Sequence, residues 1–83
     1  LGSLRSIGEA EAALRALGFA QLRVRHHGAV ARIEVDVDAF DDVLARRVDI
    51  VGAVRSAGYV YVTLDLGGFR SGSMNEALPR GER

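Results

Sequence analysis

The stretch that decides the fold is Leu22-Arg23-Val24-Arg25-His26-His27-Gly28-Ala29-Val30-Ala31-Arg32-Ile33-Glu34-Val35. Apolar and polar residues alternate on both sides of His27-Gly28, which is the period of a β-strand with one buried face. A glycine between two such runs is typical of a tight turn. The sequence therefore predicts an antiparallel hairpin that turns at His27-Gly28, with an apolar face and a polar face.

A helix is predicted before this hairpin. Ser6-Ile7-Gly8-Glu9 has the form of a capping box, and apolar residues continue at helical spacing as far as Leu17. Gly18 then supplies a residue suited to the end of a helix. The following phrase, Gly18-Phe19, is echoed by Gly58-Tyr59 later in the chain, and both lead into a predicted strand.

After the hairpin, the spacing of apolar residues from Phe40 to Val54 predicts one helix or a bent pair of helices, and Asp49 is a candidate cap for the second. The alternation from Tyr59 to Leu66 predicts a third strand. The order α-β-β-α-β indicates an α+β two-layer sandwich that resembles a ferredoxin-like fold without its first strand. We expect one domain over residues 1–75 and a frayed tail over 76–83.

Composition limits the functions open to this chain. Its 83 residues contain 11 basic and 11 acidic side chains and no cysteine. The length predicts a thin core with a shallow or shared site, and the balanced charge argues against nucleic acid as a partner. The lack of cysteine excludes a disulfide, a thiolate metal site and a cysteine nucleophile within these residues.

No run is long and apolar enough for a membrane span, so we expect a cytoplasmic protein. The start at Leu1 suggests a piece of a longer protein.

The polar face of the hairpin is the first candidate site. A turn centred on His27-Gly28 places Arg23 opposite Arg32, and two like charges in that position favour an anion between them. Glu34 or a bound phosphate could supply the negative charge. The alternative is a solvated sheet face with weak ion pairs.

Other polar residues give weaker indications. Glu11 lies at the edge of the apolar stripe of its helix, either paired with Arg15 or as a partly buried acid or base. Asp42, in an Asp-rich stretch, could hold a divalent cation or could simply favour a helix start. Arg70 and Ser73 lie in a glycine-rich loop that could bind phosphate or form a mobile tail. His26 and His27 are adjacent on a strand, so they should point to opposite sides and share no metal.

Four phrases of the sequence stand out together. They are Glu11-Ala12-Ala13-Leu14-Arg15-Ala16-Leu17-Gly18-Phe19, Leu22-Arg23-Val24-Arg25-His26-His27-Gly28, Ala31-Arg32-Ile33-Glu34-Val35 and Gly68-Phe69-Arg70-Ser71-Gly72-Ser73-Met74-Asn75-Glu76. In combination they resemble the C-terminal domain of the LarE family, ATP-dependent sacrificial sulfur transferases of the PP-loop ATP pyrophosphatase (adenine nucleotide alpha-hydrolase-like) superfamily. The resemblance covers nearly the whole chain.

The resemblance implies a role in building the nickel-pincer nucleotide cofactor of lactate racemase. Family members adenylate a pyridinium carboxylate mononucleotide with ATP and Mg2+, and then replace carboxylate oxygen by sulfur from a cysteine of the enzyme. It further implies that Arg23 and Arg25 bind substrate phosphate near a subunit interface of a homo-oligomer. Glu11 and Glu34 match acidic positions of the active site, Asp42 matches a metal-binding position, and Arg70 matches a functional arginine.

Two features of the family are not among these 83 residues: the nucleotide loop Ser-Gly-Gly-x-Asp-Ser, and a cysteine. We therefore expect the chain to bind no cofactor alone and to be inactive in isolation, while a phosphate-bearing nucleotide is its expected substrate. Two alternatives remain open. One is a stand-alone module that binds phosphate or RNA without catalysis, and the other is a purely structural dimerisation domain.

Overall fold

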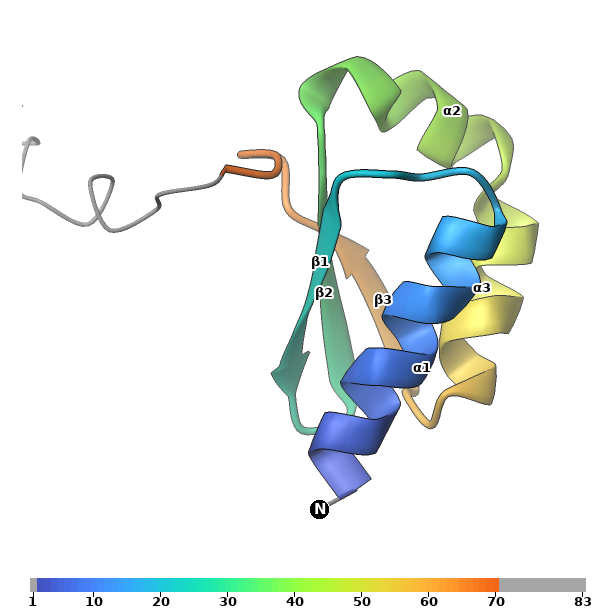
Figure 1. The fold of residues 1–83 in the computed structure, drawn as a ribbon, viewed down its shortest axis with the longest axis vertical. Helices are drawn as coiled ribbons and strands as arrows, with labels where there is room; N and C mark the ends of the chain where they lie inside the picture. Colours follow the sequence, from blue (N-terminus) through green and yellow to red (C-terminus); the bar gives the residue numbers. More distant parts are fainter. Residues whose placement is uncertain (1, 71–83) are drawn as a thin grey trace, which may run out of the picture.

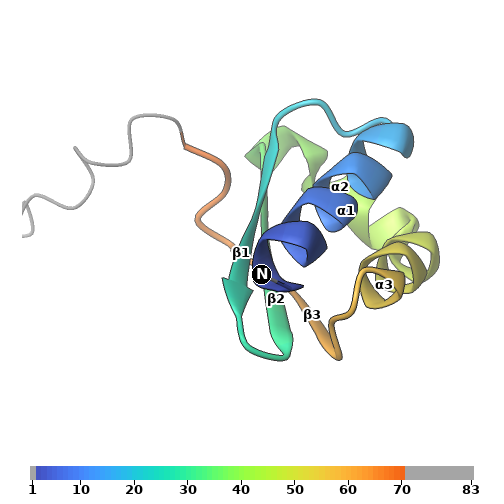
Figure 2. The same ribbon diagram turned by 60° about the horizontal axis from the view of Figure 1, so that its bottom comes forward.

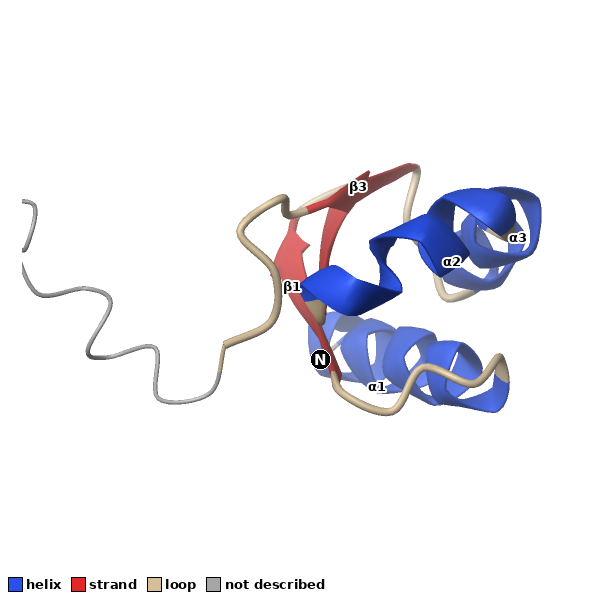
Figure 3. Cartoon of the chain, turned by 90° about the horizontal axis from the view of Figure 1, so that it is seen from above, coloured by secondary structure: helices blue, strands red, loops and turns tan. Residues whose placement is uncertain are grey.

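The computed structural model describes residues 2–70 and shows helices packed on one face of a mixed sheet (Figure 1). The elements in chain order are α1 (Gly2–Ala16), β1 (Leu22–His27), β2 (Val30–Val35), the 3-10 turn η1 (Val37–Ala39), α2 (Phe40–Ala45), α3 (Arg47–Ser56) and β3 (Tyr61–Leu64). Seen from above, the strands form one layer and the helices the other (Figure 3). The predicted α+β class and the order α-β-β-α-β are confirmed.

The helices differ from the prediction at their ends. The first helix begins at Gly2, so Ser6 and Glu9 lie inside it and form no capping box. The extra turn carries an ion pair of 4.0 Å between Arg5 and Glu9, one helical turn apart, which supports the helix there. The second helical region is a pair of helices that break at Arg46, whose backbone leaves the helical region. Asp49 therefore lies within the first turn of α3 and is not its cap.

The sheet has the order β1-β2-β3, with β2 in the middle (Figure 2). The first pair is antiparallel, and β2 and β3 are parallel. A ferredoxin-like sheet places its first strand between the strands that correspond to β2 and β3. Here these two strands pair directly, so an additional strand could join only at an outer edge of the sheet.

The hairpin turns one residue later than predicted. His27 pairs with Val30, which leaves Gly28 and Ala29 as the turn, and Gly28 has a φ of 59°. Glycine adopts this conformation at no steric cost, which explains why it occupies the first turn position. The expected pair of Arg23 with Arg32 is therefore wrong: Arg23 lies opposite Glu34, and Arg25 lies opposite Arg32. The two faces of the hairpin are unchanged, because the pairing moves by two residues.

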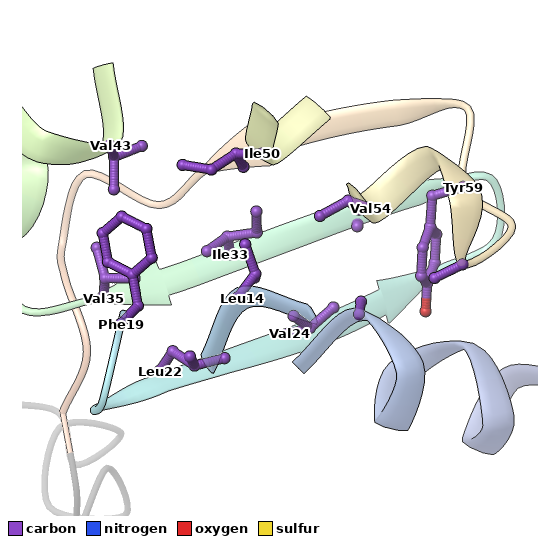
Figure 4. Close-up of a cluster of buried hydrophobic side chains, with 13 residues drawn as sticks. Leu14, Phe19, Leu22, Val24, Ile33, Val35, Val43, Ile50, Val54 and Tyr59 are labelled. Atoms are coloured by element: carbon purple, nitrogen blue, oxygen red, sulfur yellow. The ribbon is translucent and has the colours of Figure 1, made fainter. Parts of the chain in front are cut away.

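The core lies between the sheet and the helices (Figure 4). Leu14 of α1, Val35 of β2 and Val54 of α3 are its largest fully buried side chains. Phe19 and Tyr59 lie at opposite ends of the cluster (Figure 4), and each follows a glycine of positive φ at the end of a helix. The two Gly-aromatic phrases that the sequence repeats therefore close the core at its two ends. Within residues 2–70, none of the helices is long and apolar enough to cross a membrane.

Candidate functional site

The face of the sheet that points away from the helices carries the polar side chains of all three strands. Leu22 and Val24 of β1 and Ile33 of β2 are buried against the helices, so their neighbours along each strand face the other way. The polar side chains on this open face are Arg23, Arg25, His27, Arg32, Glu34, Tyr61, Thr63 and, just after β3, Asp65. We call the four arginine and acid positions that contact one another here, Arg25, Glu34, Arg32 and Asp65, the open-face network.

Glu34 is the centre of this network. Glu34 is only 6% exposed to solvent, although its side chain belongs to the open face. Arg25 Nε and Nη2 donate to Glu34 Oε2 and Oε1 at 3.3 and 3.5 Å, and Arg32 Nη1 donates to Oε2 at 3.1 Å. A carboxylate this well covered is tolerated because two guanidinium groups compensate its charge. Glu34 thus supplies the negative charge between the paired Arg25 and Arg32.

Arg32 extends the network to the segment after β3. Its Nη1 atom also donates to Asp65 Oδ2, and its Nε atom donates to His27 Nε2 at 3.3 Å. The hydrogen bond from the Gly67 backbone, with the charges of Arg32 and Arg70, holds the pKa of Asp65 below its ordinary value, against the opposing effect of burial. Arg32 was predicted only as the partner of Arg23 around an anion, and Asp65 was not among the predicted site residues. The alternation placed both on the polar face, but their contact joins positions 33 residues apart.

Of the two predicted phosphate-binding residues of the hairpin, one already has an ion-pair partner and the other has none among residues 2–70. Arg25 is engaged by Glu34, and its side chain is 40% exposed. Arg23 is exposed and, among residues 2–70, its side chain has no hydrogen-bond or ion-pair partner in the chain. The guanidinium of Arg23 is therefore the group of this face most available to an added anion.

Glu11 lies on the other side of the sheet. Its Oε2 atom accepts a hydrogen bond of 3.0 Å from the backbone N–H of Val24, and its Oε1 atom lies 3.9 Å from Arg15 Nη1. The predicted pair with Arg15 is confirmed, and the bond to β1 is an addition that helical spacing could not indicate. Because α1 covers the opposite face from Glu34, the chain does not bring these two carboxylates together, and their catalytic roles stay predictions.

The two histidines point to opposite faces, as predicted. His27 accepts from Arg32 on the open face, whereas His26 Nδ1 lies 2.8 Å from the hydroxyl of Tyr59 on the helix side. Burial, and then the nearby charge of Glu11, raises the pKa of the Tyr59 phenol. The contact between His26 and Tyr59 therefore joins the end of β1 to the core.

Asp42 lies in a third region of the fold, away from both Glu34 and Glu11. It lies in the first turn of α2, where its carboxylate is 3.6 Å from Arg46, and the Arg46 guanidinium lies 5.4 Å from the centre of the Phe19 ring. A hollow of about 420 Å³ beside it is also lined by Asp36 and Asp38. Within residues 2–70, no three histidine or acidic side chains are arranged to hold a metal ion. The metal role of Asp42 stays a prediction.

The predicted phosphate loop is described only as far as Arg70. Its Nη1 atom donates to the carbonyl of Gly67 at 3.4 Å, and its charge is close enough to Asp65 to lower the pKa of that carboxyl. The structure therefore places Arg70 at the end of the open-face network. Ser73 lies outside the described residues.

Comparison with known proteins supports the resemblance. No family model matches the chain. It is 42% identical over 80 residues to the pyridinium-3,5-bisthiocarboxylic acid mononucleotide synthase of Lactiplantibacillus plantarum, and 37% identical over 79 residues to a Synechocystis sp. protein described as uncharacterized. These matches cover 96% and 93% of this chain but only 29% and 30% of the relatives.

The chain thus spans about three tenths of the length of these two relatives. The match to the synthase extends across α1, the hairpin, the later helices and β3, because it covers nearly all of the sequence. It is therefore not limited to one short motif. The predicted resemblance is confirmed: the chain is similar over nearly its whole length to a part of the pyridinium-3,5-bisthiocarboxylic acid mononucleotide synthase, a LarE protein.

Proposed function

We propose that this chain is the substrate-binding and self-associating domain of a LarE-like, ATP-dependent sulfur transferase that acts in nickel-pincer nucleotide cofactor biosynthesis. Its substrate would be a pyridinium carboxylate mononucleotide, whose phosphate binds on the open face of the sheet. The observation that carries the proposal is the position of Arg23, exposed and unpartnered among residues 2–70 beside a fixed set of arginines. The similarity to the synthase supports the class of substrate.

The open-face network prepares this surface for an anion. Glu34 holds Arg25 and Arg32 in place, so these guanidinium groups lose little additional freedom when an anion binds. Arginine also presents a planar fork that matches phosphate oxygens. In this proposal Glu34 orients the arginines, and Arg23 makes the first contact with the phosphate.

The ATP and Mg2+ of the family do not fit a site within residues 2–70, the part of the chain that the structure describes. The nucleotide loop is not in the sequence, and Glu11, Glu34 and Asp42 lie in three separate places of the described fold. We therefore derive no step through either cofactor from these residues. In the proposal, adenylation and sulfur donation belong to other parts of the full-length enzyme.

Binding of phosphate is tested with the 83-residue chain. Inorganic phosphate and nicotinic acid mononucleotide, which is a pyridinium carboxylate mononucleotide, are titrated by NMR against the unchanged chain and against Arg23→Ala. Loss of one charged hydrogen-bonding group predicts about tenfold weaker binding. Arg5→Ala is the matched control, because it removes an exposed arginine from α1, on the other layer. Equal affinities for Arg23→Ala and Arg5→Ala would overturn the proposal, and tight binding of an RNA oligonucleotide alone would favour the alternative module.

Self-association has separate support. An apolar groove of about 240 Å³ lies between α2, α3 and β3, lined by Leu44, Val51 and Leu64 among others. Leu44 is 62% exposed, and β3 is an edge strand of the sheet that the structure describes. A second copy of the chain that covers this groove would remove apolar surface from water.

The self-association proposal predicts a size that depends on concentration in sedimentation velocity. Leu44→Asp should shift the chain to the monomer, because it places a charge in the apolar groove, whereas Leu4→Asp on α1 should not. A monomer at all concentrations, or the same shift for both variants, would contradict it.

A further inference from the structure

Asp65 holds the segment that follows β3 in a fixed turn. Its Oδ1 atom accepts a hydrogen bond of 2.8 Å from the backbone N–H of Gly67, and its carbonyl accepts one of 3.0 Å from Gly68. The N–H of Phe69 then donates to the carbonyl of Val35 at 2.7 Å. The segment is thus fixed both to its own first residue and to the end of β2.

The same carboxylate also reaches the open face. While Oδ1 binds the turn, Oδ2 accepts the hydrogen bond from Arg32 Nη1, which also contacts Glu34. One side chain therefore joins the backbone of the turn to the arginines of the hairpin. The Asp65 side chain is 20% exposed, so solvent only partly screens this ion pair.

Arg70 is positioned by this turn. Its guanidinium lies over the turn and donates to the carbonyl of Gly67. A Cβ atom at Gly67 would lie 2.9 Å from Arg70 Nη1 and 3.1 Å from Asp65 Oδ1. The close approach of Arg70 to the turn therefore depends on the absence of a side chain at position 67.

We propose that Asp65 is a positioning residue that brings Arg70 to the arginines of the hairpin, so that one phosphate group is bound from both the hairpin and the last loop. This inference rests on the proposed function. The surface holds the guanidinium groups of Arg23, Arg25, Arg32 and Arg70 against the carboxylates of Glu34 and Asp65, an excess of two positive charges. That excess matches a phosphate monoester, which carries about −1.5 to −2 charges at pH 7.

The positioning role of Asp65 can be distinguished from the effect of its negative charge alone, because the two predict opposite changes in anion affinity. Asp65→Asn keeps an oxygen that can accept from Gly67 but loses the ion pair with Arg32. If only the net charge of the surface matters, removing a negative charge strengthens anion binding. If Asp65 positions Arg70 and Arg32, the same substitution weakens it.

The experiment titrates nicotinic acid mononucleotide and inorganic phosphate into the 83-residue chain and its variants. We expect about fivefold weaker binding for Asp65→Asn and no weakening for Asp49→Asn, which removes an exposed acid from α3. Gly67→Ala is the second variant, because it keeps Asp65 and displaces Arg70, and it should weaken binding to a similar extent. Arg70→Ala should also weaken binding, and the double variant with Asp65→Asn should lose little more than either alone.

Unchanged or tighter binding by Asp65→Asn, or additive losses in the double variant, would overturn the inference. Its failure is distinguishable from the failure of the proposed function. If Arg23→Ala weakens binding while Asp65→Asn does not, only the positioning role is lost. If Arg23→Ala also leaves the affinity unchanged, the phosphate site itself is wrong.

Discussion

Acidic residues of this chain have different roles because their surroundings differ. Glu34 is covered by two arginines, Glu11 accepts a hydrogen bond from the backbone of an edge strand, and Asp42 is exposed on a short helix. Only Glu34 holds two like charges that lie directly opposite each other across a strand pair. Its charge is therefore needed for the hairpin itself, apart from any role towards substrate.

Replacing Glu34 by Gln should destabilise the fold by about 1–3 kcal/mol, because Arg25 and Arg32 then face each other without compensation. The free energy of unfolding in urea measures this effect. Glu9→Gln, on the exposed side of α1, is the matched control and should change it by less than about 0.5 kcal/mol. Equal effects of the two variants would show that the ion pairs of Glu34 in the open-face network contribute nothing to stability.

Tyr59 makes the chain sensitive to alkaline pH. Burial and Glu11 raise its pKa above the ordinary 10.0, so the folded state disfavours the phenolate. Stability from this group is fully present below pH 10 and is lost as the pH rises through the raised pKa. In Tyr61→Phe, which leaves Tyr59 as the only tyrosine, the absorbance of the phenolate should therefore appear above pH 10. A midpoint at or below 10 would contradict this.

At the scale of elements, glycines define where strands and helices end. Gly18 and Gly58 follow α1 and α3 with φ values of 109° and 114°, and Gly28 opens the hairpin turn. These positions were recognisable because glycine adopts positive φ freely. The register of the hairpin could not be recognised from the sequence. A turn at His27-Gly28 and a turn at Gly28-Ala29 both keep the apolar residues on one face, so the alternating pattern does not distinguish them.

Two glycine substitutions should have opposite effects on stability. Gly28→Ala places a side chain at a φ of 59° and should cost about 1–2 kcal/mol. Gly52→Ala lies in α3, where nothing is within 4 Å of the added Cβ, and should stabilise by about 0.5–1 kcal/mol. Thermal unfolding followed by circular dichroism compares them. The assignment of the turn would be wrong if Gly28→Ala melted at or above the temperature of the unchanged chain.

At the scale of the whole molecule, one thin core supports both layers. Leu14 is 1% exposed and lies in the buried cluster between α1 and the sheet (Figure 4). A domain of this size has a total stability of only about 4–12 kcal/mol. The positions of the side chains on the open face therefore depend on packing on the opposite side of the sheet, since the strands that carry the arginines pack against the helices.

Leu14→Ala should accordingly lower the free energy of unfolding by about 2–5 kcal/mol, because it leaves a cavity in the core. Leu4→Ala, whose side chain is 76% exposed, should change it by less than about 0.5 kcal/mol. Urea denaturation of both variants makes the comparison. A loss below 1 kcal/mol for Leu14→Ala would mean that the core is not organised around this helix.

The sequence by itself determined the α+β class, the order of elements, and the two faces of the hairpin. These features depend on periodicity and on glycine, which act over a few neighbouring residues. The arginines of the predicted site were also recognisable, because they alternate along strands whose other face is apolar. The resemblance to the LarE family was evident from phrases distributed along the chain.

Only the tertiary structure decided which polar groups of distant elements meet. The bond from Arg32 to Asp65 joins residues 33 positions apart, Glu11 accepts from a strand 13 positions away, and β3 pairs directly with β2. A local pattern cannot specify such contacts, because they depend on strand register and on how the layers pack. The physical reason is that secondary structure arises from short-range conformational preferences, whereas the open-face network exists only after distant strands have paired.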